Sequence, residues 1–159
     1  MNYFELFDIP ITLNIDNSQL SKKYVELQKK YHPDFYTQSD VEEQESVLQK
    51  SSDINKALKI FRNKEQTIKY VLGLKGLLQE EEKFQLPPDF LMDVMDLNEN
   101  LSDGSTIAIN AFEKDIYSGV EKIIENYDDA TISTENLLKI KEYYFKKKYL
   151  QRILDRLID

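Results

Sequence analysis

The spacing of apolar residues constrains the fold of this chain more than any other feature. Large apolar side chains recur every three or four residues between Leu20 and Tyr31, and again between Val47 and Phe61, where Ser51 fills one position of the series. This spacing places them on one face of a helix. No segment shows the alternation of a strand, and only 4 Gly and 4 Pro leave little room for the turns of an all-β fold. We therefore predict an all-α protein.

The first 76 residues are expected to form a short helix, an antiparallel hairpin of two long helices and a further short helix. Asp16 or Asn17 can cap the first long helix. Its expected buried stripe comprises Leu20, Tyr24, Leu27 and Tyr31. Ser39 and Glu42 have the spacing of a capping box at the start of the second long helix. Gly76 is expected to end the region.

The remaining residues are expected to form a linker and a three-helix bundle. Three consecutive glutamates and Pro87-Pro88 indicate a linker over 77–88. Apolar spacing then predicts helices from Asp89 to Leu101, across Ile109 to Tyr127, and from Ser133 or Thr134 onward. A break is expected at residues 102–105. The predicted organisation is 1–76, 77–88 and 89–159.

Composition restricts the classes of function. The net charge is −8, and residues 77–138 carry 3 basic against 15 acidic side chains, which disfavours nucleic acid as a partner. Residues 139–159 carry 7 against 3. The chain has no Cys and one His, so we expect neither a thiolate-bound metal or cluster nor a multi-histidine metal site. No apolar run approaches the roughly 18 residues of a membrane span, and no secretory signal is recognisable, so we expect neither membrane insertion nor secretion.

The tripeptide His32-Pro33-Asp34 is the main candidate for function. Pro33 disfavours helical geometry at His32, so the first long helix ends there and the tripeptide lies in an exposed loop. Asp34 can then accept hydrogen bonds from an arginine of another protein. The alternative is a plain helix stop followed by a turn residue. An acid–base pair of His32 and Asp34 lacks a second catalytic residue or a phosphate loop, so we do not predict an enzyme.

Residues 3–61 resemble a J domain, the module that activates ATPase chaperones of the DnaK and HscA type. The resemblance rests on a short first helix, a basic second helix ending at Tyr31, the tripeptide, and the segment Ile54-Asn55-Lys56-Ala57 in the third helix. The whole chain resembles the HscB family, J-protein co-chaperones of iron–sulfur cluster assembly. Segments that carry this closer resemblance are 3–7 (YFELF), 54–58 (INKAL), 67–74 (TIKYVLGL) and 90–99 (FLMDVMDLNE).

The resemblance implies a co-chaperone that stimulates the ATPase of an HscA/DnaK-type chaperone and delivers the scaffold protein IscU to it. The residues assigned to chaperone binding are His32, Pro33, Asp34, Lys22, Lys23, Lys29 and Lys30. The four lysines lie off the apolar stripe and should face solvent. Their alternative role is a solvated helix face that keeps the protein soluble. The resemblance also implies a location in the bacterial cytoplasm, and no bound cofactor, because the cluster would stay on the scaffold's own ligands.

The segment 90–99 is what the family uses to bind the scaffold. It holds too many apolar residues for one narrow buried stripe, so some should form an exposed patch rimmed by acidic side chains. The residues assigned to scaffold binding are Leu91, Met92, Met95, Asp96 and Glu99. The alternative is that all the apolar residues are bundle core. A J-protein with a different client and a helical adaptor outside the chaperone system remain open.

Overall fold

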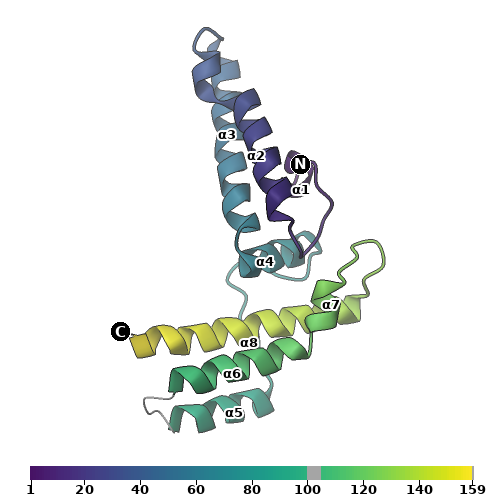
Figure 1. The fold of residues 1–159 in the computed structure, drawn as a ribbon, viewed down its shortest axis with the longest axis vertical. Coiled ribbons are helices and arrows are strands. Elements are labelled where there is room, and N and C mark those ends of the chain that lie inside the picture. Colours follow the sequence, from purple (N-terminus) through teal and green to yellow (C-terminus); the bar gives the residue numbers. More distant parts are fainter. Residues whose placement is uncertain (100–104, 159) are drawn as a thin grey trace. The chain divides into compact units, whose positions relative to one another are not determined.

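The computed structural model describes the backbone of residues 1–99 and 105–158 and the side chains of 1–97 and 106–156. Its elements, in order, are α1 (Tyr3–Phe7), α2 (Asn17–Tyr31), the 3₁₀ helix η1 (Pro33–Tyr36), α3 (Val41–Phe61), α4 (Lys64–Leu74), α5 (Pro88–Glu99), α6 (Ser105–Ser118), α7 (Glu121–Glu125) and α8 (Thr134–Ile158). Within the described ranges there is no strand (Figure 1). The predicted all-α class is confirmed.

The chain divides into two compact units, Met1–Val71 and Leu72–Asp159. The division falls within α4, five residues before the predicted limit of 76, and the sequence-based limits of the linker and bundle stay a prediction. Gly76 has a φ of +73°, and the Leu77 N–H donates to Leu72 O at 3.0 Å. This closure at the end of α4 suits glycine, because a positive φ costs a residue without Cβ little.

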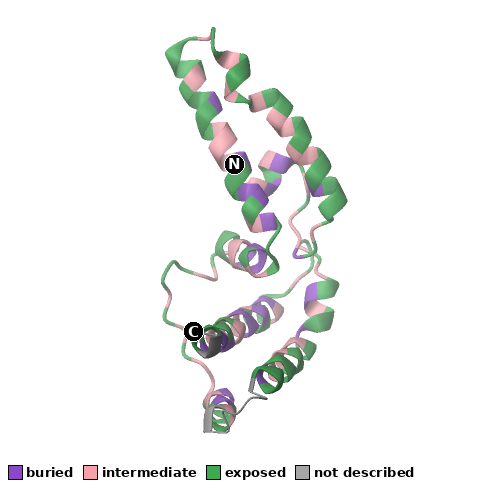
Figure 2. Ribbon diagram, turned by 60° about the vertical axis from the view of Figure 1, so that its left-hand side comes forward, coloured by how far each residue is buried: buried purple, intermediate pink, exposed green. Residues whose placement is uncertain are grey.

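The first unit is an antiparallel hairpin of α2 and α3 with α1 packed beside one end (Figure 1). That end holds an aromatic core, because Phe61 of α3 contacts Phe4 and Phe7 of α1 at ring distances of 4.8 and 5.5 Å. Tyr70 of α4 adds its hydroxyl, which accepts the N–H of Tyr3 at 2.8 Å. Most buried side chains of the unit gather here (Figure 2).

The outer part of the hairpin has few buried residues, which corrects the predicted stripe on α2. Leu20 is buried, but Tyr24, Leu27 and Tyr31 are only half-buried. Among the described residues of this unit, no third α-helix packs on the outer part, so α2 and α3 can each cover only one side of the other there. The hydroxyl of Tyr24 lies at this exposed side of the hairpin and donates to Asn55 Oδ1 of α3 at 3.0 Å.

The caps of the two long helices follow the predicted chemistry with one shift. Asp16 caps α2, and its carboxylate accepts from the N–H groups of Ser18 and Gln19. Asp40, rather than the predicted Ser39, caps α3 and accepts the Glu43 N–H at 2.8 Å. Asp and Ser are similar as caps, so spacing alone cannot choose between neighbours.

In the second unit α5, α6 and α8 lie side by side (Figure 1). Their shared core takes one apolar face from each helix. It comprises Phe90 and Val94 of α5, Ile109 of α6, and Leu150, Ile153 and Leu154 of α8. Phe112 of α6 stacks on Phe90 at 5.7 Å between ring centres. This packing fits the predicted bundle of three amphipathic helices.

The second predicted helix of this bundle is broken, and α7 is an additional short helix. Ser118 ends α6 and its hydroxyl donates to Asp115 O at 2.6 Å, which competes with the helical hydrogen bonds. Gly119 follows, and glycine is a poor helix former. Val120 then closes a tight turn by donating to Tyr117 O at 2.9 Å. Leu101 and most of the break expected at 102–105 lie outside the described residues.

Candidate functional site

The His32-Pro33-Asp34 corner lies at the free end of the hairpin, between α2 and α3. His32 has extended backbone angles (φ −69°, ψ 129°), as a residue before proline requires. The chain then turns through η1, where the Phe35 N–H donates to His32 O at 3.0 Å. The Asp34 side chain is 84% exposed and that of His32 46%. The corner is therefore accessible, with Asp34 as its most exposed member.

The histidine ring positions the aspartate. The Asp34 N–H donates to His32 Nδ1 at 3.3 Å, and the Asp34 carboxylate lies 3.6 Å from the same nitrogen. The separation of 3.6 Å between Nδ1 and the carboxylate is longer than a hydrogen bond, so the ring holds the backbone of Asp34 and not its side chain. The carboxylate therefore keeps its hydrogen-bonding capacity for a partner.

Two further side chains hold the corner in place, and both were missed by the sequence analysis. The Tyr36 hydroxyl donates to Lys30 O, in the last turn of α2, at 2.6 Å. Gln44 of α3 donates to the carbonyl oxygens of Tyr36 and Thr37, each at 3.1 Å. These bonds tie the end of α2 and the turn after it to the side chains of Tyr36 and Gln44. Spacing along the chain gives no signal for either contact.

Three of the four predicted lysines on α2 are exposed, and one is not. Lys22, Lys29 and Lys30 face solvent as expected. Lys23 is half-buried, and its ammonium lies 3.5 Å from the carboxylate of Asp8, so the prediction that it faces solvent is wrong. Asp8 follows α1, which packs against α2 at this point. The basic face of α2 is therefore formed by Lys22, Lys29 and Lys30.

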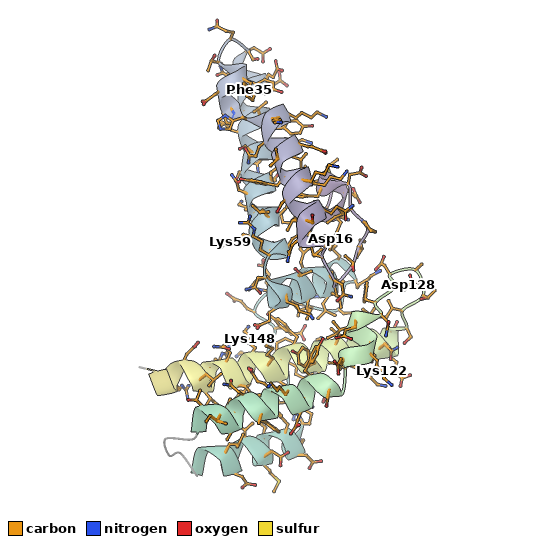
Figure 3. All side chains as sticks on the ribbon, viewed as in Figure 1. Asp16, Phe35, Lys59, Lys122, Asp128 and Lys148 are labelled. Carbon is orange, nitrogen blue, oxygen red and sulfur yellow. The ribbon has the colours of Figure 1, made fainter. Side chains whose placement is uncertain are left out.

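Apolar side chains also lie open on this unit. Val25 is 50% exposed and stands at helical spacing between Lys22 and Lys29. Phe35 and Val41, on either side of the turn into α3, are 68% and 70% exposed (Figure 3 labels Phe35). The sequence could have indicated Val25, because it lies off the apolar stripe. Phe35 and Val41 depend on the turn itself.

On α5 two methionines form the centre of an exposed surface. Met92 is 63% and Met95 60% exposed, whereas Phe90 and Val94 of the same helix are buried in the core. Asp89, Asp93 and Asp96 are also exposed, so acidic groups surround the two thioethers. We call the set Met92, Met95, Asp89, Asp93 and Asp96 the methionine patch.

The predicted scaffold-binding residues divide into three groups. Met92, Met95 and Asp96 lie in the methionine patch, and Asp89 and Asp93 were not predicted. Leu91 is half-buried and packs against the bundle core, which corrects its predicted exposure. The Glu99 side chain lies outside the described residues. Helical spacing could have indicated both missed residues, because Asp89 lies three residues before Met92 and Asp93 lies three residues before Asp96.

Metal-binding and membrane-spanning features do not occur in the part of the chain that the structure describes. No cluster of three or more His, Cys, Asp or Glu side chains suited to a metal ion is found among the described residues. Over the same residues, no helix has the length and apolar character needed to span a membrane.

Comparisons with known proteins agree with one another. The pattern of the HSCB C-terminal oligomerisation domain matches residues 86–158. The co-chaperone protein HscB homolog of Colwellia psychrerythraea is 30% identical over 175 residues, which cover 100% of this chain and 99% of that protein. That of Vibrio parahaemolyticus is 36% identical over 104 residues, which span 65% of this chain but only 61% of its own length.

Two solved structures resemble the fold. The chaperone HscB from Vibrio cholerae is 27% identical, with a TM-score of 0.63 over 99% of both chains. The human co-chaperone HscB is similar in fold, with a TM-score of 0.77 over 98% of this chain and 80% of that one, at 24% identity. The match to the Colwellia protein extends over both units and is close enough to establish the relationship. This chain belongs to the HscB family of co-chaperone proteins.

Proposed function

We propose that this chain stimulates the ATPase of an HscA/DnaK-type chaperone and delivers an IscU-like iron–sulfur scaffold protein to it. The first unit docks on the chaperone through His32, Pro33, Asp34 and the basic face of α2, with Lys23 as a minor contributor. The second unit binds the scaffold through α5. The cluster stays on the scaffold as cargo, and the chain itself holds no cofactor and catalyses no reaction. We place this activity in the bacterial cytoplasm.

The observation that carries the proposal is the exposure of the Asp34 carboxylate at a corner fixed by hydrogen bonds. A preorganised acceptor loses little entropy when an arginine of the partner binds it. The nearby lysines would steer an acidic surface of the chaperone toward the corner.

The decisive experiment replaces Asp34 by Asn, which keeps the shape and removes the charge. We expect stimulation of the chaperone's steady-state ATPase to fall at least about tenfold, because a charge-assisted hydrogen bond at the interface is lost. Glu42→Gln, an exposed change of the same kind at the start of α3, is the matched control and should leave stimulation unchanged. Full stimulation by the Asp34→Asn variant would overturn the chaperone half of the proposal.

The methionine patch supports the scaffold half of the proposal. Methionine side chains are flexible and adapt to a partner's surface, and exposed apolar groups surrounded by charge are typical of binding sites. Leu91 would contribute from the edge of the core, and Glu99 from the end of α5. Holding both partners on one chain raises the effective concentration of each at the other.

The double variant Met92→Ala/Met95→Ala tests this surface. We expect calorimetric titration with the scaffold protein to show an affinity lowered at least about tenfold. Leu138→Ala removes an apolar side chain that is 48% exposed on α8 and serves as the control. If scaffold and chain together stimulate the ATPase only additively, delivery is wrong. If capture with the native chain yields another client and no scaffold, the client is a different protein.

A further inference from the structure

A cavity of about 560 Å³ lies between the segment before α5 and the outer face of α8. Its wall includes three aromatic rings, Phe84, Phe145 and Tyr149, and three cations, Lys83, Lys148 and Arg152 (Figure 3 labels Lys148). Pockets for small ligands have volumes of roughly 300–1,000 Å³ and combine an apolar lining with a few polar groups. The cavity has the size and lining of such a pocket, and neither surface of the proposed function includes it.

The wall formed by the segment before α5 is fixed to α8 by two contacts. Phe84 stacks on Phe145 with ring centres 4.7 Å apart and planes within 3° of parallel. The Glu82 carboxylate lies 2.7 Å from Lys141 Nζ. The hydrogen bond from Lys141 is the main reason why the pKa of Glu82 is lowered, so this carboxylate is ionised at neutral pH. The cavity is therefore built by specific contacts between two segments.

The three cations of the cavity differ in their ion pairing from Lys139, Lys141 and Lys146 of α8. Lys139 and Lys146 are paired with glutamates on the same helix, and Lys141 is paired with Glu82. Over the described ranges, no ion pair is found for Lys83, Lys148 or Arg152. Glu81 and Glu82 also line the cavity; Glu82 is paired with Lys141, so Glu81 alone offsets one of these charges. The lining of the cavity therefore has a net positive charge, although the second unit as a whole is negatively charged.

From this arrangement we infer that the cavity binds a small amphipathic organic anion, with a carboxylate, sulfonate or phosphate at the cations and an apolar group against the rings. Arg152 can hold such an oxyanion in a two-pronged hydrogen bond, and Lys148 lies one helical turn before it on the same face. Phe145 and Tyr149 have the same spacing and supply the apolar wall. Both parts of the ligand are needed for strong binding.

The probe for the experiment is anilinonaphthalene sulfonate, an aromatic anion whose fluorescence rises in apolar sites. Titration of the full chain should show saturable binding at one site. Lys148→Glu/Arg152→Glu should weaken this binding about tenfold or more, because two attractive charges become repulsive. Both side chains are exposed, so the variant should keep the unfolding midpoint of the native chain.

Two matched variants distinguish binding in the cavity from binding elsewhere on the chain. Lys139→Glu/Arg156→Glu makes the same change in net charge on α8 outside the cavity, and should weaken the binding less than about twofold. Met92→Ala/Met95→Ala removes the exposed methionines and should have no effect. If both charge reversals lower the probe's affinity equally, the probe is bound only by the overall charge of the chain. If the methionine variant lowers the affinity, the probe binds on α5. Either result overturns the inference.

A measurement on the native chain covers the case in which a variant does not fold. Amide NMR shifts on adding the probe should concentrate at residues 81–86 and 145–152. Inorganic phosphate alone, which lacks the apolar group, should produce only weak changes at the same amides. Shifts spread over the surface, or confined to the hairpin, would contradict a site in this cavity.

Discussion

The tip of the hairpin and the methionine patch on α5 are both exposed, but they are supported differently. The tip holds its shape through polar contacts, from His32 Nδ1 to the Asp34 backbone and from Tyr36 and Gln44 to nearby carbonyl groups. The patch lies on a helix whose opposite face, with Phe90 and Val94, is buried in the core. A fixed charged acceptor thus needs hydrogen bonds around it, whereas adaptable side chains need only a firmly packed helix beneath them.

The largest expected effect comes from the same substitution made in both regions. Phe90→Ala removes a buried ring that stacks on Phe112, and we expect the second unit to lose about 3–5 kcal/mol of unfolding free energy. Phe35→Ala removes an exposed ring at the tip and should change it by less than about 0.5 kcal/mol. Urea unfolding followed by circular dichroism measures both. Similar losses for the two variants would mean that the tip has a packed core of its own.

The Phe90→Ala variant should lose one of the two proposed activities and keep the other. Scaffold binding should weaken with Phe90→Ala, because the helix that carries the patch loses its support. ATPase stimulation should be retained in the same variant, since α5 and the hairpin belong to separate units. A loss of both activities would show that the two units do not work independently.

The second-largest expected effect is that of salt on the two binding affinities. Salt should weaken a contact between charges more than an apolar contact, so it distinguishes the surface on the hairpin from the methionine patch. Raising ionic strength from about 0.05 to about 0.5 M shortens the range of charge attraction to a few ångströms. Chaperone docking, steered by Lys22, Lys29 and Lys30, should weaken about tenfold. Scaffold binding should weaken less than about threefold, because the methionines make apolar contacts. Equal weakening would indicate that the aspartates around the methionines dominate scaffold binding.

The sequence predicted most of this fold, because each long helix carries a strong apolar period. The same period also predicted a buried stripe on α2 that the structure contains only at Leu20. Periodicity shows which face can be covered but not whether another element covers it, and among the described residues no third α-helix of the first unit packs on the outer part of the hairpin. The N-cap of α3 could not be predicted for a similar reason, because the neighbours Ser39 and Asp40 are equally good capping residues.

The candidate site was predicted where the residues themselves determine the geometry. Pro33 alone dictates the end of α2, so the corner could be located. The contact of Lys23 with Asp8 joins residues that are close only after α1 packs against α2, so spacing on α2 misplaced that lysine. The supporting residues Tyr36 and Gln44 likewise depend on how the turn folds back. The resemblance to a family supplied roles for the site but no such contacts.

The smallest expected effect concerns the hydroxyl that holds the corner. Tyr36→Phe keeps the ring and removes the hydrogen bond to Lys30 O, so the end of α2 and the turn are less constrained. We expect a loss of about 0.5–1.5 kcal/mol in unfolding free energy, the usual net contribution of one hydrogen bond. ATPase stimulation at a subsaturating concentration of the chain should fall about two- to fivefold, which corresponds to a similar free energy.

A second phenylalanine variant tests whether the expected fall in ATPase stimulation is specific to the hydroxyl of Tyr36. Tyr31 lies one residue before His32, and among the described residues its hydroxyl makes no hydrogen bond that Tyr31→Phe would remove. That variant should therefore stimulate the ATPase as well as the native chain does. If Tyr36→Phe also retains full stimulation while its stability falls, the tip does not need to be rigid to act. Asp34 would then work from a mobile turn, and the contrast with the methionine patch would be one of charge alone.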